Sequence, residues 1–453
     1  MHRNSDTVST KQRRIAELAS QSPEMAFTSL AYFMDIDWLS EAYRKTRKDG
    51  AVGVDGVTAA EYEQDLEGNL QRLLDRAKSG SYRAPPVRRV YIPKGTSTTE
   101  VRPIGIPTLE DKLLQRAVVM LLEPIYKHDF LDCSYGFRPG RSAHQALESL
   151  WKQTMNIDGG WILEVDIRKF FDHLSHEHLR AFLQHRVRDG VLKKLIHKWL
   201  KAGVLEDGSV SYPDAGSPQG GVISPTLSNI FLHYVLDVWF AEEVKPRLAG
   251  HAFLIRFADD FAMGFRHERD ARRVLEVLSK RFERYGLTIH PDKTRLICFE
   301  SPSTSARDDK TNVDDKPGTF DLLGFTHYWG KSRQGTWVVK RKTASSRFGR
   351  ALRSIAHWCR NNRHRPVSEQ HVKLRQKLHG HYAYYGISGN YDALKRFKYE
   401  VHRRWHKWLN RRNRQRELLW SQFNALLRRF PLPQPRIVHR STQRTHDLRN
   451  RMH

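Results

Sequence analysis

Cysteine and long apolar runs are the features that this sequence most clearly lacks. Its 453 residues include only Cys133, Cys298 and Cys359, which are too far apart for a zinc knuckle or a disulfide framework and so predict a reducing, intracellular compartment. No run approaches about 18 apolar residues, so no membrane-spanning helix is expected. The charged N-terminus also lacks the apolar stretch of a signal peptide. Neither a phosphate-binding P-loop motif nor a Ser-His-Asp set is present.

Acidic residues are scarce in the last quarter of the chain. From Arg341 onward there are 28 Lys and Arg residues and 5 Asp and Glu residues, whereas the whole chain has 77 and 50 and a formal charge of +27. A nearly neutral body therefore carries a strongly basic C-terminal quarter, in which basic positions alternate with aromatic ones at helical spacing. This pattern indicates a polyanionic partner. The alternative is a basic surface that only keeps the protein soluble.

Composition and apolar periodicity divide the chain into four segments. Hydrophobic residues make up 39% of the chain, a globular composition that excludes collagen-like and low-complexity chains. We expect a flexible segment at 1–24, a body of helices and strands at 25–340, a basic helical bundle at 341–430 and an extended tail at 431–453. In the bundle, steps of three and four residues define an apolar helical stripe of Leu394, Phe397, Val401, Trp405 and Trp408.

Two short segments place acidic residues at the ends of predicted strands. The alternation over 161–166 predicts a strand that ends at Asp166. The apolar runs 253–257 and 261–265 flank Ala258-Asp259-Asp260, which predicts a hairpin with an acidic tip. Further strands are expected over 87–92 and 101–107, and a second hairpin over 320–328 and 336–340.

Adjacent carboxylates on a tight apolar hairpin are electrostatically unfavourable. Two such charges a few ångströms apart repel by roughly 1 kcal/mol in water and by more when they are partly buried. A bound divalent cation removes that repulsion, and hard oxygen ligands suit Mg²⁺. If Asp166, Asp259 and Asp260 meet, they can hold two ions that stabilise the attacking and leaving oxygens of a phosphoryl transfer. The alternative is that Asp259 and Asp260 form an ordinary polar turn, in which Asp is common.

The segment Phe257-Ala258-Asp259-Asp260 resembles the aromatic-Ala-Asp-Asp box of reverse transcriptases, with Phe257 in the place of the usual Tyr. The lost hydroxyl should leave metal binding unaffected. Four other segments resemble boxes of that family and follow its order: 166–172 the first catalytic box, 216–221 the box between the two, 286–294 the box after them and 322–325 the primer grip. Each box is weak alone, but the ordered set is specific.

Three further segments are similar to group II intron-encoded reverse transcriptases and maturases. These are 102–107, 135–142 and 378–386, the last of which resembles the RNA-binding maturase segment. The resemblance extends from about residue 25 to about residue 438. Some members of that family also carry a Cys/His endonuclease after a DNA-binding segment. Only about 15 residues follow Val438 and none is a cysteine, so we expect the form without the endonuclease.

The resemblance implies a role for several residues of the catalytic boxes. Asp166 and Asp259 would be the main ligands of two Mg²⁺ ions, with Asp260 in support. Phe171 would lie beneath the sugar of the incoming nucleotide and exclude a 2′-hydroxyl, unless it is a core residue. Gln219 would lie beside the nucleotide, where the flanking glycines permit close approach of the backbone.

Basic residues are expected around the nucleotide and the nucleic acid. Lys94 and Arg102 would contact the triphosphate, because cationic groups pair with phosphate oxygens; the alternative is a pair of solvated strand charges. Lys293 would protonate the leaving pyrophosphate or pair with its charge. The implied template and primer contacts are Arg138, Arg141, Gly324 and Phe325. For the two arginines, the alternative is a salt bridge within a turn.

By resemblance, the fold is α+β in the right-hand polymerase arrangement, with fingers and palm in 25–340 and a basic helical thumb after about Arg341. The implied activity is RNA-templated DNA synthesis, in which the primer 3′-hydroxyl attacks the α-phosphate of a dNTP. The partners would be an RNA template, a DNA primer or target, and a structured intron RNA whose splicing and mobility the protein assists. We therefore expect a bacterial cytoplasmic protein that associates with the nucleoid when it binds DNA.

Two other functions are compatible with the same sequence. A related reverse transcriptase without an intron would serve in phage defence, CRISPR spacer acquisition or DNA repair, and the sequence boxes do not separate it from an intron-encoded one. A non-enzymatic RNA-binding splicing factor would keep the fold without the chemistry. The presence of all three carboxylates argues against that factor.

Overall fold

The computed structural model describes residues 3–93, 101–206, 209–212, 216, 220–302, 317–412 and 417–440. The chain forms two compact units. Among the described residues, the first unit consists of those up to 93, 101–149 and 160–296, and the second consists of 150–159 and those from Ile297 onward. Helices and strands are mixed in both units. No helix in the described part of the chain is both long and apolar enough to cross a lipid bilayer.

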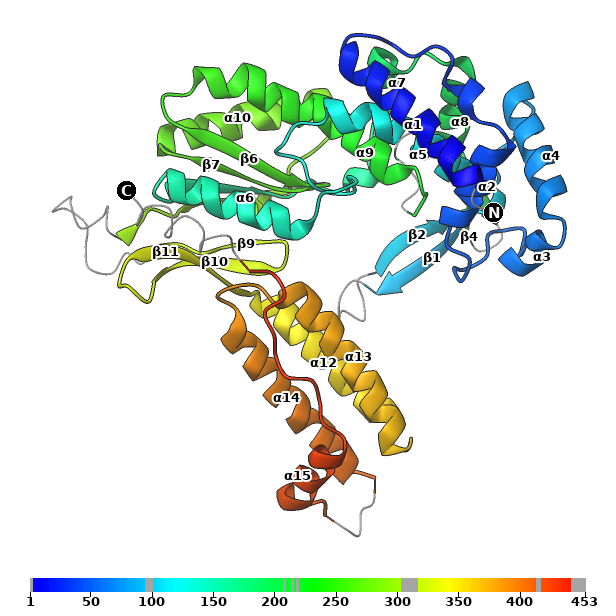
Figure 1. Cartoon of the computed structure of the whole chain (residues 1–453). Coiled ribbons are helices and arrows are strands. Elements are labelled where there is room, and N and C mark those ends of the chain that lie inside the picture. Colours follow the sequence, from blue (N-terminus) through cyan, green and yellow to red (C-terminus); the bar gives the residue numbers. More distant parts are fainter. Residues whose placement is uncertain are drawn as a thin grey trace. The chain divides into compact units, whose positions relative to one another are not determined.

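The first unit is built around the long helix α5 (Leu109–Asp129). It begins after Thr108, whose hydroxyl accepts a hydrogen bond from the backbone N–H of Asp111, and most of its apolar side chains are buried, as in a core helix. Three helices pack against it: α1 (Arg3–Gln21), α2 (Ile36–Lys45) and α9 (Ser224–Leu232) (Figure 1). The other helices are α3 (Ala59–Glu63), α4 (Leu66–Ser79), α7 (His176–Arg186), α8 (Gly190–Leu200) and α10 (Glu268–Arg284), while α6 (Ala143–Asn156) leads from this unit into the second.

The prediction of a flexible segment at 1–24 is wrong for α1. Its residues Val8, Ile15 and Ala19 are buried, and the helix packs against α2 and α5. The side-chain amide of Gln12 also donates a hydrogen bond to the carbonyl oxygen of Met120, at 3.1 Å. The buried stripe is narrow and polar residues fill most other positions, so the polar composition of this segment hides its amphipathic pattern.

Two four-stranded sheets belong to the first unit, and the last strand of the second sheet leads into the second unit. The first has the order β2-β1-β4-β5, with β1 antiparallel to β2 and parallel to β4. The second has the order β6-β7-β3-β8, and α10 packs against β3 and β7. The strands confirm the expected early pair and acidic hairpin: β1 (Val87–Pro93), β2 (Val101–Ile106), β3 (Trp161–Val165), β4 (Val204–Glu206), β5 (Ser209–Ser211), β6 (Ala252–Phe257), β7 (Asp260–Phe265) and β8 (Arg295–Cys298).

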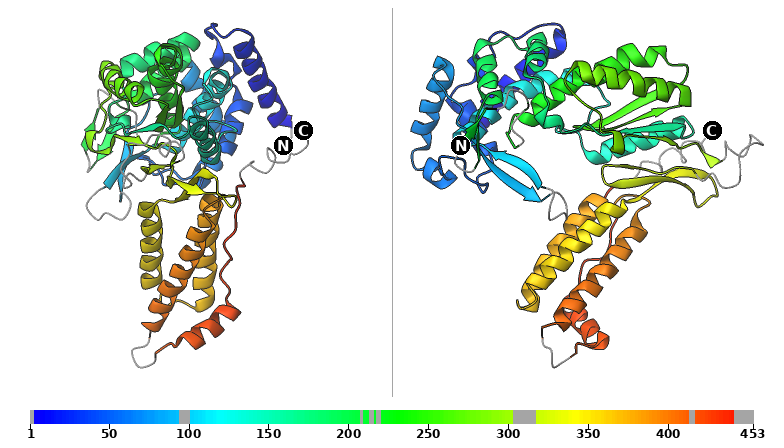
Figure 2. Two further views of the ribbon diagram at one scale, coloured as in Figure 1. Left: turned by 90° about the vertical axis from the view of Figure 1, so that its left-hand side faces the viewer. Right: turned by 180° about the vertical axis from the view of Figure 1, so that it is seen from behind.

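The second unit combines a three-stranded sheet of order β11-β10-β9 with a set of long helices. Leu394, Phe397, Val401 and Trp405 of the predicted stripe are buried in its core, and Trp408 is half-buried. Helices α12 and α14 run side by side, and the segment after α15 extends back along them until His439 pairs with Ile387 (Figure 2). The elements are β9 (Phe320–Leu322), β10 (Phe325–Lys331), β11 (Trp337–Thr343), α12 (Ser345–Asn361), α13 (Val367–Tyr385), α14 (Tyr391–Asn410) and α15 (Trp420–Arg429).

The second unit differs from expectation in two places. The boundary expected near residue 340 lies inside this unit, because the Asn390 side chain bonds to the backbone N–H and the hydroxyl of Thr343, both at 2.9 Å, and so ties β11 to the helices. The strand expected over 320–328 is divided into β9 and β10. Leu323 and Gly324 have positive φ angles of 50° and 81°, and they reverse the chain between the two strands.

Candidate active site

Three carboxylates lie at one end of the sheet formed by β6, β7 and β3. Val165, the last residue of β3, pairs with Phe261 of β7, so Asp166 follows directly beside Asp260, the first residue of β7. A two-residue turn joins β6 to β7, and Asp259 is its second residue. Antiparallel pairing thus brings three acidic residues that are far apart in the sequence to the same end of one sheet.

The charges around Asp259 are compatible with a cation site. Burial raises the pKa of Asp259 above its ordinary value and the negative charge of Asp166 acts in the same direction, whereas the positive charge of Arg102 lowers it. Asp166 itself pairs with Lys293, with 2.9 Å between Oδ2 and Nζ. Within the described residues, no three His, Cys, Asp or Glu side chains already converge as metal ligands. The fit to Mg²⁺ therefore rests on the donor chemistry, which is a set of hard carboxylate oxygens from two half-buried residues, Asp166 and Asp259, and one exposed residue, Asp260.

The backbone of the acidic turn, residues 257–260, is held in a strained conformation. Ala258 has a φ of 59°, a left-handed value that costs a non-glycine residue about 1–2 kcal/mol. Gly136 packs directly against this turn, because a Cβ atom added to Gly136 would lie 2.4 Å from the backbone nitrogen of Ala258. Only glycine fits at this close approach, so the loop that contains Gly136 supports the turn through backbone contact.

A buried arginine holds the same turn from within the sheet. Arg256 of β6 is fully buried and donates hydrogen bonds to both carboxylate oxygens of Asp237, at 2.7 and 2.5 Å. It also donates to Oδ1 of Asn229 at 2.9 Å and to the carbonyl oxygen of Ala258 at 3.0 Å. Asn229 in turn donates to the carbonyl oxygen of Gly136 at 2.7 Å. Burial opposes the charge of Arg256, yet the adjacent Asp237 raises its pKa above the ordinary value.

The sequence-based prediction missed this buried network. One signal was present, because Arg256 interrupts the apolar strand 253–257. The position of its partner Asp237 could not be predicted, because the segments His233–Asp237 and Trp239–Val244 are π-helical. Their wider turns shift the register of the helix that begins as α9, so a periodicity of 3.6 residues does not place Asp237 relative to Asn229.

The predicted nucleotide-binding residues are described only in part. Arg102 lies exposed on β2, close enough to Asp259 to lower its pKa. Phe171 follows shortly after β3 and is half-buried, with its ring 5.3 Å from that of Phe170 between centroids. Lys94 and Gln219 lie outside the described residues.

Two glycines of the predicted box at 216–221 pack closely against other segments of the first unit. The N–H of Gly216 donates to the carbonyl oxygen of Leu174 at 2.9 Å, and a Cβ at Gly216 would lie 2.8 Å from the carbonyl oxygen of Phe171. A Cβ at Gly220 would lie 2.4 Å from the carbonyl oxygen of Gly105 on β2. The two ends of this box are therefore held against the segment after β3 and against β2, in the same unit as the carboxylates.

The side chain of Arg138, a predicted nucleic-acid contact, is largely buried, so its guanidinium has a structural role within the loop. Its contact with a template or primer stays a prediction. The guanidinium donates hydrogen bonds of 2.6–2.9 Å to the carbonyl oxygens of Phe130, Leu131 and Ser134. Arg141 is half-buried; it pairs with Asp132 and lies over the ring of Tyr135. For Arg141 the salt-bridge alternative is therefore present, and a nucleic-acid contact stays a prediction.

The predicted primer grip is a turn of the second unit, and Phe325 is its internal support. Phe325 is fully buried, with its ring centroid 5.2 Å from that of Tyr385, so its side chain packs inside the unit. A contact of this residue with template or primer stays a prediction. The hydroxyl of Tyr384 donates to the carbonyl oxygen of Leu323 at 2.7 Å. The carbonyl oxygen of Gly324 accepts a hydrogen bond from Ala344 at 3.0 Å. The segment 378–386 thus packs its tyrosines against this turn.

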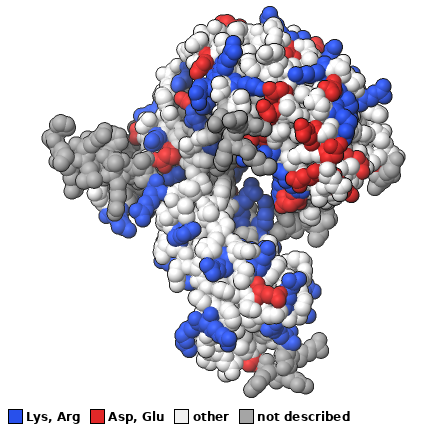
Figure 3. Space-filling view, turned by 45° about the vertical axis from the view of Figure 1, so that its right-hand side comes forward, with Lys and Arg blue, Asp and Glu red and all other residues white. Residues whose placement is uncertain are grey.

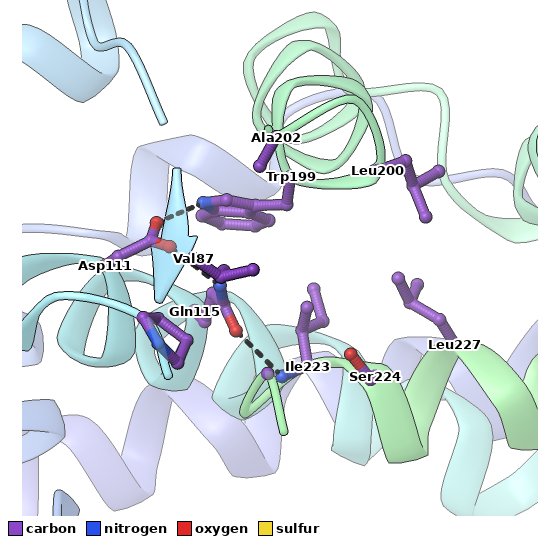
Figure 4. A pocket seen from close by; sticks show the side chains of 11 residues that line it. Val87, Asp111, Gln115, Trp199, Leu200, Ala202, Ile223, Ser224 and Leu227 are labelled. Carbon is purple, nitrogen blue, oxygen red and sulfur yellow. Dashed lines mark hydrogen bonds between the residues drawn. The ribbon is translucent and has the colours of Figure 1, made fainter. Parts of the chain in front are cut away.

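A buried polar cluster joins α5, α8 and the start of α9 beside a small, largely apolar pocket (Figure 4). Asp111 accepts hydrogen bonds from the hydroxyl of Tyr82 and the indole of Trp199, both at 2.6 Å, and from the amide of Gln115 at 3.2 Å. Gln115 accepts another from the N–H of Ile223, also at 3.2 Å. Burial raises the pKa of Asp111 to about 6. Because these polar groups satisfy one another, the cluster is a structural link between helices.

The fold and the site together define a class of protein. Carboxylates at the end of an antiparallel sheet, next to a cationic strand of a second sheet, are suited to metal-assisted phosphoryl transfer. Residues 92–327, just over half of the chain, match the family described as reverse transcriptase (RNA-dependent DNA polymerase). The chain belongs to that family.

The chain is similar to bacterial and mitochondrial proteins. The chain is 40% identical to Protein YkfC of Escherichia coli K12 over 233 residues, which is 50% of this chain and 61% of YkfC. It is 37% identical to the group II intron-encoded protein LtrA of Lactococcus lactis over 223 residues, 49% of this chain and 36% of LtrA. With nuclear intron maturase 4 of Arabidopsis thaliana, identity is 29% over 128 residues, 28% of this chain and 16% of the relative. The matches thus span from about a sixth to about three fifths of these relatives.

Proposed function

We propose that the protein is an RNA-directed DNA polymerase of the group II intron type, which joins a dNTP to a DNA primer on an RNA template. The observation that carries the proposal is the convergence of Asp166, Asp259 and Asp260 at one end of one sheet, within the residues that match the reverse transcriptase family. A plain polar turn explains neither the half-buried state of Asp259 nor the strained backbone of Ala258 that presents it.

The carboxylates would hold two Mg²⁺ ions, with Asp166 and Asp259 as the main ligands and Asp260 in support. When bound there, such ions would supply Lewis-acid chemistry, which favours the attacking hydroxyl and the charge of the leaving group. The chain's own contribution is positioning. Arg256 fixes the carbonyl of Ala258, and this constrains the direction in which the neighbouring carboxylate of Asp259 points.

Cationic residues near the carboxylates suit the triphosphate and the leaving pyrophosphate. Lys293, paired with Asp166 in this structure, would turn to the phosphates as the carboxylate engages a metal ion. Arg102, exposed on β2, can bind two phosphate oxygens at once.

Phe171 would select deoxyribose by excluding a 2′-hydroxyl. Replacing Phe171 by Ala is therefore expected to raise rNTP incorporation, measured by primer extension with mixed nucleotides, and unchanged sugar selection would contradict this role.

The right-hand arrangement of the polymerase fold is the next part of the proposal. The sheet β6-β7-β3-β8 would be the palm, the sheet of β1 and β2 part of the fingers, and the helices α12, α13 and α14 the thumb. Lys and Arg side chains are spread along the helical face of the second unit with few acidic ones between them (Figure 3). Such a surface suits the phosphates of a duplex or of a structured RNA.

The intron role rests on sequence similarity and on the second unit. LtrA, by its name an intron-encoded protein, is 37% identical over about half of this chain. The segment 378–386, which resembles the RNA-binding maturase segment, packs as a helical element against the turn of Leu323 and Gly324. The proposed partner is a structured intron RNA, whose splicing and mobility the protein would assist.

Primer extension on an RNA template tests the enzymatic proposal. Changing Asp259 to Asn keeps the shape of the side chain and removes its charge, so extension by the variant should fall by about a thousandfold or more, the rate equivalent of a metal-assisted stabilisation of several kcal/mol. Asp75→Asn, at an exposed position of α4, is the matched control and should extend like the wild type. Equal extension by the Asp259 variant and the wild type would overturn the proposal.

A splicing assay tests the intron role separately. A group II intron RNA encoded around the reading frame would be incubated at low Mg²⁺ with wild-type protein and with the Asp259→Asn variant. Both proteins should accelerate splicing, because RNA binding by the second unit does not require polymerisation. No acceleration by either protein, alongside normal primer extension, would leave a reverse transcriptase without an intron as the better account.

A further inference from the structure

Phe137 is an exposed aromatic residue in a strained backbone conformation. Its φ is 53°, in the left-handed region that bulky residues rarely adopt, and 60% of its surface is accessible. An aromatic side chain usually gains stability by burial, and Phe137 has neither burial nor a relaxed backbone. Strain of this kind persists only where the surrounding structure enforces it, and it concentrates at functional sites.

The residues on either side of Phe137 fix it firmly. Before it, Gly136 packs against the backbone of Ala258, and its carbonyl oxygen accepts a hydrogen bond from Asn229. After it, Arg138 is buried with its guanidinium bonded to three backbone carbonyl oxygens. The loop therefore holds Phe137 with little freedom, and the aromatic ring is presented to solvent at a defined position.

That position adjoins the acidic turn. The ring centroid of Phe137 lies 6.3 Å from that of Phe257, the residue that precedes Ala258 and Asp259. All of these residues belong to the first unit. A nucleic acid whose reacting end reaches Asp259 would pass close to Phe137.

We propose that Phe137 is a stacking platform for one nucleobase of the primer–template, next to the proposed catalytic carboxylates. An exposed aromatic ring stacks on any base because every base has a π-face, and such a contact needs no sequence readout. The pre-formed loop is well suited to this role, since little conformational freedom is lost on binding. This inference rests on the proposed polymerase function and adds a base-binding subsite to it. The base belongs to the template or to the primer, and the two share the same stacking chemistry.

The affinity of Phe137 variants for a primer–template tests whether the ring contributes to binding. Affinity for an RNA template annealed to a fluorescent DNA primer would be measured by anisotropy for the wild type and for Phe137→Ala. The variant should bind roughly 10-fold more weakly, a typical loss for one stacked base. Phe137→Tyr, which keeps the ring, should restore binding to within about twofold of the wild type. Tyr32→Ala, at another exposed aromatic position of the first unit, should bind like the wild type.

A scan of abasic sites then locates the partner. A single abasic position would be moved along the template and, separately, along the primer. At one position the wild type should lose about as much affinity as Phe137→Ala loses with an intact duplex, and the variant should lose no more there, because both changes remove the same contact. The strand that carries this position tells whether the base comes from template or primer. Additive losses at every position, or unchanged binding by Phe137→Ala, would overturn the stacking proposal.

A control variant and the primer-extension result separate this outcome from others. Phe137→Gly removes the backbone strain, so its thermal midpoint should equal or exceed that of the wild type while its binding falls as for Phe137→Ala. A binding loss in this stably folded variant cannot come from misfolding. If the wild type extends primers but shows no coupling at any abasic position, only the stacking inference fails. If the wild type does not extend primers at all, the proposed function fails, while the binding scan still decides whether Phe137 stacks.

Discussion

Two sets of charged residues, one in each unit, are held in opposite ways. In the first unit, Arg256 and Asp237 are fully buried and form a fixed pair beside the acidic turn. In the second unit, cations such as Lys395 and Arg403 are 57% and 56% exposed and pair with acidic residues one helical turn away. A few buried charges can fix geometry, because their positions are enforced by hydrogen bonds, whereas many exposed charges contribute affinity by releasing counterions from a nucleic acid.

The largest effect that we expect is the dependence of RNA affinity on salt concentration. If the second unit neutralises six to ten phosphates, affinity should fall by roughly 10³–10⁵ between 50 and 200 mM salt. Changing Lys395, Arg403 and Lys407 to Gln should reduce the slope of log affinity against log salt by about 0.7–0.9 for each cation that contacts phosphate. Filter binding at several salt concentrations measures the slope, with Asp75→Asn as a control. An unchanged slope would mean that these exposed cations do not contact RNA.

The stability of arginine variants tests how much the buried pair contributes compared with an exposed pair. Changing Arg256 to Met leaves Asp237 buried without its partner, which should lower the free energy of unfolding by about 3–5 kcal/mol. The matched change Arg403→Met, at an exposed pair with Glu400, should cost no more than about 1 kcal/mol. Urea unfolding of the two variants gives both values. Similar losses in the free energy of unfolding for the two variants would mean that the buried pair contributes no more to stability than the exposed one.

Acid should affect buried groups of the two units in opposite directions. In the first unit, burial raises the pKa of Asp111 to about 6, so the protonated form is favoured in the folded state. Its contribution to stability is fully present below pH 4 and is lost as the pH rises through about 6, a change of about 3 kcal/mol. In the second unit, burial lowers the pKa of His327 to about 3. Its contribution is present above about pH 6.5 and is lost as the pH falls toward 3.

Unfolding measured from pH 4 to pH 7 tests these opposite signs. Relative to Asp111→Asn, the wild type should lose stability as the pH rises. Relative to His327→Leu, the wild type should gain stability over the same range. The buried imidazole has no hydrogen-bond partner among the described residues for either ring nitrogen, so it must stay neutral. Parallel pH profiles for the wild type and either variant would show that the group in question does not titrate differently on folding.

Much of this architecture follows from local sequence patterns. The strand that leads to Asp166 and the hairpin that bears Asp259 can be predicted, because apolar alternation and short turns are local features. The stripe of α14 can be predicted for the same reason. The contacts that join these elements cannot be predicted in the same way. The hydrogen bond from Arg256 to Asp237 spans 19 positions of sequence and depends on how π-helical turns rotate the helix after α9.

The packing contacts that could not be predicted from the sequence have a common physical origin. Arg138 looks like a surface cation in the sequence, yet its fork of donors matches three backbone carbonyl oxygens inside a loop. Phe325 looks like part of a nucleic-acid contact, yet it fills the space beneath a turn. In α1 the buried stripe of Val8, Ile15 and Ala19 is too narrow to stand out from a polar segment. In each case, the residue is buried by a partner that is remote in the sequence or by backbone groups.

Metal binding by the three carboxylates can be measured without turnover. Mn²⁺ would replace Mg²⁺ in a complex of the protein with an RNA template, a DNA primer that lacks its 3′-hydroxyl, and a dNTP, and bound Mn²⁺ would be counted by electron paramagnetic resonance. We expect two protein-dependent ions in the wild type and the loss of at least one in Asp259→Asn, with Asp75→Asn unchanged. Equal Mn²⁺ binding by the wild type and Asp259→Asn would mean that this carboxylate holds no catalytic metal ion.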